Sequence, residues 1–211
     1  MIREHFLPLP VIGLGAGARL YRPVQHLPDQ VTLESPALEV MTDFKQVPAL
    51  TIEPEASIEA ANAEMIRRGV RLLFVTDRQD RLLGLITATD ILSEQVVLAM
   101  QARGVSRQEV LVREIFTPLE SLEAIDMEQV HGAKVGHVLS TLKQTGRQHA
   151  IVVDVFEPTF HETLTMSLPA ARIETVRGLF STTQIARQLG LQLQIPEIAT
   201  TFAEVERLLA R

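Results

Sequence analysis

Gly69-Val-Arg-Leu-Leu-Phe-Val-Thr-Asp77 is a short apolar stretch between a glycine and an aspartate, and it returns 77 residues later as Gly146-Arg-Gln-His-Ala-Ile-Val-Val-Asp154. The two stretches hold the same place in two longer segments, residues 38–92 and 113–188, which repeat each other. A unit of this length that occurs as a pair predicts two half-modules that bury their apolar faces against each other.

The second copy differs from the first by an insertion. Asp77 and Gly84 are seven residues apart, whereas Asp154 and Gly178 are twenty-four apart, so the second copy carries seventeen extra residues. We expect the inserted residues 155–172 to lengthen a hairpin into an arm on the surface, where insertions are tolerated. A partner-binding role for this arm is the alternative.

The hydrophobic pattern of the first copy predicts the order β-α-β-β-α. Ser57 is suited to begin a helix and Gly69 to end it, and the polar turn after Asp77 is typical of a hairpin. The predicted elements are a strand over residues 47–52, a helix over 58–68 with Ile58, Ala61, Met65 and Ile66 on one face, strands over 71–76 and 82–86, and a helix from Thr87 or Thr89 to Gly104.

The second copy repeats this order. Ser106 and Glu109 predict a capping box for a linking helix. An apolar stripe predicts a helix that Gly146 ends, followed by a strand over residues 150–154 and a helix over 184–188. The fold class is therefore α/β, with an arm over residues 1–36, a first repeat over 37–105, a second over 106–190, and a C-terminal strand and helix over 191–211.

The helix expected over residues 90–103 is apolar on nearly every side, through Val96-Val-Leu-Ala-Met100. Such a helix is normally buried on more than one face. We therefore expect it either to pack between the two repeats or to form a self-association surface.

Composition excludes several classes of protein. The chain has 211 residues, a formal charge of −6 and no cysteine. The negative charge argues against a general nucleic-acid partner, and the missing thiols exclude disulfides, thiolate catalysis and zinc–thiolate sites. No apolar stretch is long enough to span a membrane. Glu4, Pro8 and Pro10 argue against a secretory leader, so we expect a cytoplasmic protein.

One motif can hold a sugar and a phosphate side by side. In Gly84-Leu-Ile-Thr87-Ala-Thr-Asp90 a strand ends, hydroxyls open a helix, and a carboxylate lies in its first turn. The free N–H groups at a helix start favour a phosphate, and the Thr87 hydroxyl can donate to it. A carboxylate suits the two adjacent hydroxyls of a ribose. Plain helix capping is the alternative role for both residues.

The Gly-apolar-x-Thr-x-x-Asp motif, in a β-α-β-β-α unit that occurs twice, resembles the CBS domain, the family named after cystathionine β-synthase. Val40-Met-Thr42 and the two Gly-to-Asp stretches support the resemblance, which covers about residues 37–190. Phe74 departs from the family, which commonly has a proline in that strand. The resemblance implies tandem repeats that bind adenosyl ligands such as AMP, ADP, ATP or S-adenosylmethionine.

Carried over to this sequence, the resemblance implies that Asp90 holds the ribose and that Thr87 contacts ribose or phosphate. The strand Ala49-Leu50-Thr51 would face the adenine, and Arg71 would meet the phosphates.

The second motif departs from the pattern. Gly178-Leu-Phe-Ser181-Thr-Thr-Gln184 has glutamine where a carboxylate is expected, and a neutral amide makes weaker hydrogen bonds to hydroxyls. We expect a weak or empty second site around Ser181 and Gln184. His149 lies in a strand that would border the cleft, where it could contact phosphate or adenine.

The function that follows is regulatory and not enzymatic: reversible binding of an adenine nucleotide or S-adenosylmethionine between the repeats. The six histidines lack metal-ligand spacing and no nucleophile elbow is present, so we expect no metal, no cofactor and no catalysis. The resemblance implies a homodimer, and with no catalytic or transport domain attached we expect a regulated partner in trans. The alternative is a ligand-free scaffold for assembly.

Overall fold

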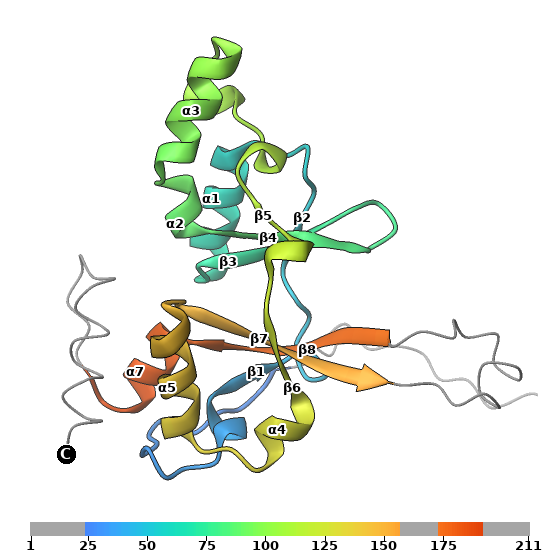
Figure 1. Cartoon of the computed structure of the whole chain (residues 1–211). Coiled ribbons are helices and arrows are strands. Elements are labelled where there is room, and N and C mark those ends of the chain that lie inside the picture. Colours follow the sequence, from blue (N-terminus) through green and yellow to red (C-terminus); the bar gives the residue numbers. More distant parts are fainter. Residues whose placement is uncertain (1–23, 157–172, 192–211) are drawn as a thin grey trace, which may run out of the picture.

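The computed structural model describes residues 24–156 and 173–191. In this part of the chain two four-stranded sheets face each other, and helices cover the outer side of each (Figure 1). The predicted α/β class and the paired half-modules are confirmed. The expected C-terminal strand and helix over residues 191–211, and residues 157–172 of the insertion, lie outside the described residues, apart from Leu191.

The first sheet belongs mostly to the first repeat. Its strand order is β2-β3-β4-β5, with β2 parallel to β3 and the other pairs antiparallel. The strands are β2 (Thr51–Ile52), β3 (Leu72–Thr76), β4 (Leu82–Thr87) and β5 (Thr117–Pro118), and the helices that accompany them are α1 (Ile58–Arg68), α2 (Ala88–Ile91) and α3 (Glu94–Arg103).

The second sheet has the same plan, with the order β1-β8-β7-β6 and one parallel pair, β6 with β7. Its strands are β1 (Met41–Asp43), β6 (Ala124–Asp126), β7 (His149–Phe156) and β8 (Ile173–Ser181), and its helices are α4 (Met127–His131), α5 (Val135–Thr145) and α7 (Thr182–Gln188). Single turns of 3-10 helix are η1 (Ala37–Val40), η2 (Arg107–Glu109), η3 (Val112–Glu114) and η4 (Leu119–Ser121).

The two repeats exchange their first strands. The strand β1 precedes the first sheet in the chain but pairs with β8, and β5 pairs with β4 of the first sheet. Gly84 and Gly178 permit these pairings, because a Cβ atom on either one would lie only 2.1 Å from the carbonyl oxygen of Thr117 or 2.6 Å from that of Thr42. The glycine of each repeated motif is thus required by close backbone approach.

The core has an apolar cluster on the helical side of each sheet and a third cluster between the sheets. The third cluster joins the repeats. Its buried members come from three strands of the two sheets and are Leu72, Phe74, Leu85, Ile151 and Val153. Phe74, which stands where the family commonly has proline, is buried there and contacts the ring of Phe44 edge-on, with 5.6 Å between the ring centres.

The helix α1 confirms the predicted start and end. The Ser57 hydroxyl accepts a hydrogen bond from the Ala60 N–H over 3.1 Å, and Gly69 ends the helix with a φ of 67°. Ile58, Ala61 and Met65 are buried as expected. The placement of Ile66 on the buried face is wrong, since 74 % of that residue is exposed.

The prediction of one helix from Thr87 to Gly104 is also wrong. The chain leaves α2 at Leu92 and starts α3 after Ser93, whose backbone is extended and whose hydroxyl donates to the Asp90 carbonyl. The break turns α3 away from the second sheet (Figure 1). Val97 and Leu98 are 51 % and 62 % exposed, which excludes the expected packing of this helix between the repeats.

Two further elements are shorter than expected. The strand predicted over residues 47–52 is reduced to Thr51–Ile52, because the N–H groups of Gln46 and Val47 bond back to the carbonyl of Asp43 in a turn. The linking helix after Ser106 is a single 3-10 turn, although the predicted capping box with Glu109 is present.

The described part of the arm, residues 24–36, packs on the second repeat. The buried amide of Gln188 donates to the carbonyl oxygens of Pro28 and Glu39, and its backbone oxygen accepts from Val31. These bonds bind the arm and η1 to α7.

Candidate functional site

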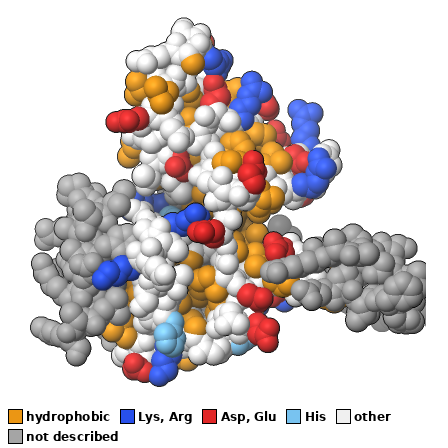
Figure 2. Space-filling model, in the orientation of Figure 1, with side chains coloured by type: hydrophobic (Ala, Val, Ile, Leu, Met, Phe, Trp, Pro, Cys, Tyr) orange, Lys and Arg blue, Asp and Glu red, His pale blue; other side chains and the backbone are white. Residues whose placement is uncertain are grey.

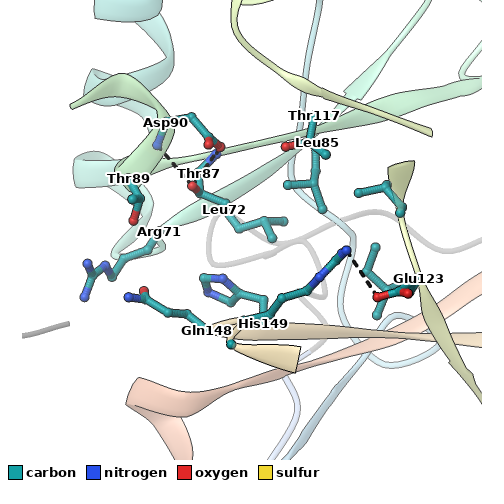
Figure 3. Close-up of a pocket in the computed structure, with 14 residues that line it drawn as sticks. Arg71, Leu72, Leu85, Thr87, Thr89, Asp90, Thr117, Glu123, Gln148 and His149 are labelled. Atoms are coloured by element: carbon teal, nitrogen blue, oxygen red, sulfur yellow. Dashed lines mark hydrogen bonds and ion pairs between the residues drawn. The ribbon is translucent and has the colours of Figure 1, made fainter. Parts of the chain in front are cut away.

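A cavity of about 410 Å³ opens between the two sheets at the Thr87 motif, and we call it the first cleft (Figure 3). Thr87, Thr89 and Asp90 lie on one side of it, and Gln148 and His149 face them from the other. The remaining lining residues are Arg71, Leu72, Leu85, Thr117, Leu122, Glu123, Gly146, Arg147 and Ile151.

The carboxylate of Asp90 is bonded to the start of its own helix. One oxygen, Oδ2, accepts from the Thr87 N–H over 2.7 Å and from the Thr87 hydroxyl over 2.8 Å. The Asp90 N–H donates back to the Thr87 hydroxyl over 3.3 Å, which completes a capping box. The capping role is therefore real. It also orients the carboxylate, because only one of its two oxygens carries these bonds and both residues remain partly exposed.

Charges in the first cleft are balanced. Asp90 and Glu123 supply two carboxylates, and Arg71 and Arg147 supply two guanidinium groups. Arg147 forms an ion pair with Glu123 over 3.2 Å, while Arg71 is largely exposed (Figure 3). The cleft can thus receive both hydroxyl donors and an anionic group.

His149 is held in its neutral form. Burial, and secondarily the positive charge of Arg71, lower the pKa of His149 to about 4. At neutral pH its ring therefore has one N–H donor and one acceptor nitrogen, which is suited to hydrogen bonding with a neutral ring or hydroxyl.

A larger cavity of about 730 Å³ lies at the other motif, and we call it the second cleft. Arg71, Leu72 and His149 line both clefts. The other residues of the second cleft are Thr42, Phe44, Val47, Pro48, Leu50, Arg68, Gly69, Val70, Phe74, Leu179, Ser181, Thr183, Gln184 and Arg187.

Gln184 occupies the place that Asp90 has in the first repeat, but its side chain makes different hydrogen bonds. Its amide oxygen accepts from the Thr42 hydroxyl over 3.3 Å, and its amide nitrogen donates to the Val40 carbonyl over 3.3 Å. Ser181 makes no capping bond from its side chain. Gln184 therefore ties the exchanged segment to α7, and the weak second nucleotide site stays a prediction.

The structure brings together only part of the predicted ligand set. Thr87, Asp90 and Arg71 do meet in the first cleft. Leu50 instead lines the second cleft, while Ala49 packs against the cluster between the sheets and Thr51 is exposed. Neither of these two lines a cleft, so the predicted meeting of all three strand residues with Asp90 does not occur.

Residues of the second repeat line the first cleft where the strand Ala49-Leu50-Thr51 was expected. The parallel pairings of Thr51 with Phe74 and of Ala124 with Ile151 are equivalent, which makes Leu122 and Glu123 the counterparts of Ala49 and Leu50. The sequence reasoning missed these two residues and Arg147. The 77-residue offset between the repeats would have pointed to Asp126 and Met127 instead, because the spacing before this strand differs between the copies, and the exchange that carries Leu122 and Glu123 to Asp90 leaves no signal in the sequence.

Residues 24–156 and 173–191 contain no group of three or more His, Asp or Glu side chains placed to hold a metal ion. No helix among these residues is long and apolar enough to cross a membrane.

Comparison with known proteins identifies one family for the first repeat. Residues 37–97 match the family model described as the CBS domain. No curated protein matches the chain.

The chain is similar to several solved structures, of which three are described. An uncharacterized conserved protein from Pyrococcus horikoshii is 17 % identical, with 78 % of this chain and 98 % of that one covered and a TM-score of 0.49. CBSX2 in complex with AMP is 16 % identical, with coverage of 72 % and 94 % and a TM-score of 0.46. The CBS domain pair of MJ0100, in complex with 5′-methylthioadenosine and S-adenosyl-L-methionine, is 18 % identical, with coverage of 72 % and 98 % and a TM-score of 0.44.

Proposed function

Since the chain is a CBS-domain-pair protein, with a first repeat that matches the family and a second built on the same plan, we propose that it is a regulatory module that reversibly binds an adenosyl ligand in the first cleft. The observation that carries the proposal is the convergence of Asp90, Thr87, Thr89 and Arg71 on one cavity between the repeats. Its volume lies in the range of roughly 300–1,000 Å³ that is usual for ligand sites.

Each part of the ligand has a complementary group. The Asp90 oxygen that is not used in the capping box can accept from the ribose hydroxyls. Arg71 can meet an anionic tail, and the Thr89 side chain at the mouth can donate to it. Leu72, Leu85, Leu122 and Ile151 supply an apolar wall for the base. This placement assigns the base to residues of both sheets.

Binding without catalysis fits this site better than chemistry. The low pKa of His149 makes it a poor general base at neutral pH, and one oxygen of Asp90 already accepts two hydrogen bonds from Thr87. A ligand between the two sheets contacts both repeats and can favour one arrangement of them over another. The effect would pass to a separate regulated partner in the cytoplasm, where adenine nucleotides are abundant.

We further propose that the active form is a homodimer. Large apolar side chains are exposed on the outer surface of the first repeat, and Figure 2 shows hydrophobic side chains there over α3. The residues are Ile66, Leu92, Val97 and Leu98, with exposed fractions of 74 %, 81 %, 51 % and 62 %. Exposed large apolar side chains that gather on one repeat are typical of a self-association surface.

The second candidate is a ligand-free scaffold for assembly. One observation favours it: the polar groups of Gln184, and one oxygen of Asp90, are already bonded within the protein. In that case the motifs would serve only to cap helices and hold the exchanged strands.

Calorimetry with AMP, ATP and S-adenosylmethionine separates the candidates. A regulatory module should bind at least one of them with a stoichiometry of one per chain and lose affinity in an Asp90→Asn variant. Gln184→Glu is the matched comparison, since it changes the equivalent residue of the other cleft. Absence of binding by all three compounds would favour the scaffold.

A further inference from the structure

The second cleft differs from the first in charge. Three arginines line it, Arg68, Arg71 and Arg187, and no carboxylate is among its described lining residues. Arg68 shares Glu64 with Arg67, at 3.0 Å from the Arg68 Nε atom, so its charge is partly compensated. Among the described residues, no hydrogen bond or ion pair engages the guanidinium groups of Arg71 and Arg187. The cleft is therefore positive where the first cleft is balanced.

The walls of the second cleft are apolar. Phe44 and Phe74 meet edge-on there, and Val47, Pro48, Leu50, Val70, Leu72 and Leu179 complete the lining. The hydroxyls of Ser181 and Thr183 and the ring of His149 are further polar groups of the lining. A ligand that fits this surface has an anionic head and an apolar body.

The second cleft is poorly suited to a ribose. The residue that would hold the sugar is Gln184, and both ends of its amide bond to Thr42 and Val40 in the exchanged segment. A nucleoside would have to break these bonds, and without a carboxylate it would gain only neutral hydrogen bonds. The chemistry that selects a nucleotide in the first cleft is thus absent from the second.

We propose that the second cleft is a separate site for a small amphiphilic anion, with a phosphate or carboxylate head held by Arg187 and Arg71 and an apolar body between Phe44, Leu50 and Leu179. Guanidinium groups bind such heads through paired hydrogen bonds. The cavity of about 730 Å³ accommodates a head together with a body of about eight carbon atoms. The site shares Arg71 with the first cleft, but Thr87, Thr89 and Asp90 do not line it, so it requires no adenosyl ligand in the first cleft.

Octyl phosphate, used below its micelle-forming concentration, is a suitable probe for calorimetry with the full chain. We expect saturable binding at one site per chain and at least tenfold weaker binding of 1-octanol, which has the same body without the charge. Arg187→Gln should weaken octyl phosphate about tenfold or more, since charged hydrogen bonds are worth that much. Arg187 is exposed, so the substitution is compatible with folding.

Two controls isolate the site. Arg113→Gln removes the same charge from an exposed arginine that pairs with Glu55 and lines neither cleft, and it should leave the affinity unchanged. Asp90→Asn should weaken adenosyl ligands and leave octyl phosphate unaffected. The proposal is overturned by no binding of octyl phosphate, by equal binding of 1-octanol, by equal losses in the Arg187 and Arg113 variants, or by ATP competing for the cleft with a dependence on Arg187.

Discussion

We expect Asp90 both to stabilise the start of α2 and to bind the ligand, and two substitutions separate these roles. Its Oδ2 atom caps α2 through two short hydrogen bonds from Thr87, while its other oxygen is available to a ligand. Thr87 is the N-cap, and Asp90 accepts from its N–H as the other half of the capping box; asparagine keeps an acceptor oxygen for this bond, whereas alanine removes it. Asp90→Asn should therefore keep the stability of the protein and lose ligand affinity, and Asp90→Ala should lose both.

The magnitudes follow from the geometry. Loss of the hydrogen bonds that Asp90 accepts from Thr87 costs about 1 kcal/mol, and the partial exposure of both residues gives no reason for a larger value. Loss of charged hydrogen bonds to the ribose costs roughly 1.5–3 kcal/mol, which is about a tenfold to hundredfold rise in Kd. A ligand at a hundred times its Kd stabilises the wild type by about 2.7 kcal/mol, and the Asp90→Asn variant should lose about 1.3 to 2.3 kcal/mol of this gain for a tenfold to hundredfold rise in Kd.

Urea unfolding with and without the best adenosyl ligand measures both effects in one assay. The unliganded Asp90→Asn protein should unfold near the wild-type midpoint, and the Asp90→Ala protein earlier. The reasoning is refuted if Asp90→Asn binds the ligand as tightly as the wild type, because the carboxylate would then serve the helix alone.

Three other predictions test different parts of the structure. Gly84→Ala should destabilise the protein by more than about 2 kcal/mol in urea, because its Cβ atom would collide with the carbonyl of Thr117, while Gly132→Ala, which has open space, should be nearly neutral. Stability should fall as the pH drops from about 6.5 to about 4, since the unfolded chain protonates His149 before the folded one does; His149→Gln should reduce this slope in unfolding titrations, and an unchanged slope would contradict the cause given. Leu98→Glu should shift light-scattering mass towards the monomer without loss of stability, and an unchanged mass would place the dimer contact elsewhere.

Parts of the fold were predictable from the sequence because their signals are local. Ser57 and Gly69 bound α1, Gly146 ends α5 with a φ of 65°, and the alternation of apolar and turn residues predicts the hairpin of β3 and β4. The capping pair Thr87 and Asp90 was also visible in the motif.

The prediction of one helix from Thr87 to Gly104 is wrong because the chain breaks the helix at Ser93. The apolar run through Val97 and Leu98 reads as buried helix, but Ser93 takes an extended backbone and its hydroxyl bonds to the preceding turn. The same residues therefore lie on an exposed surface. Periodicity reports an apolar face and does not report what that face contacts.

The sequence by itself determined the duplication, the motifs and the loss of the carboxylate at Gln184, since each is a property of the residue types and their spacing. Only the tertiary structure decided which residues share a cleft. The exchange of β1 and β5 between the sheets brings Leu122 and Glu123 to Asp90 and sends Leu50 to Gln184. Strand pairing between distant segments depends on the burial of both repeats together, and no local pattern encodes it.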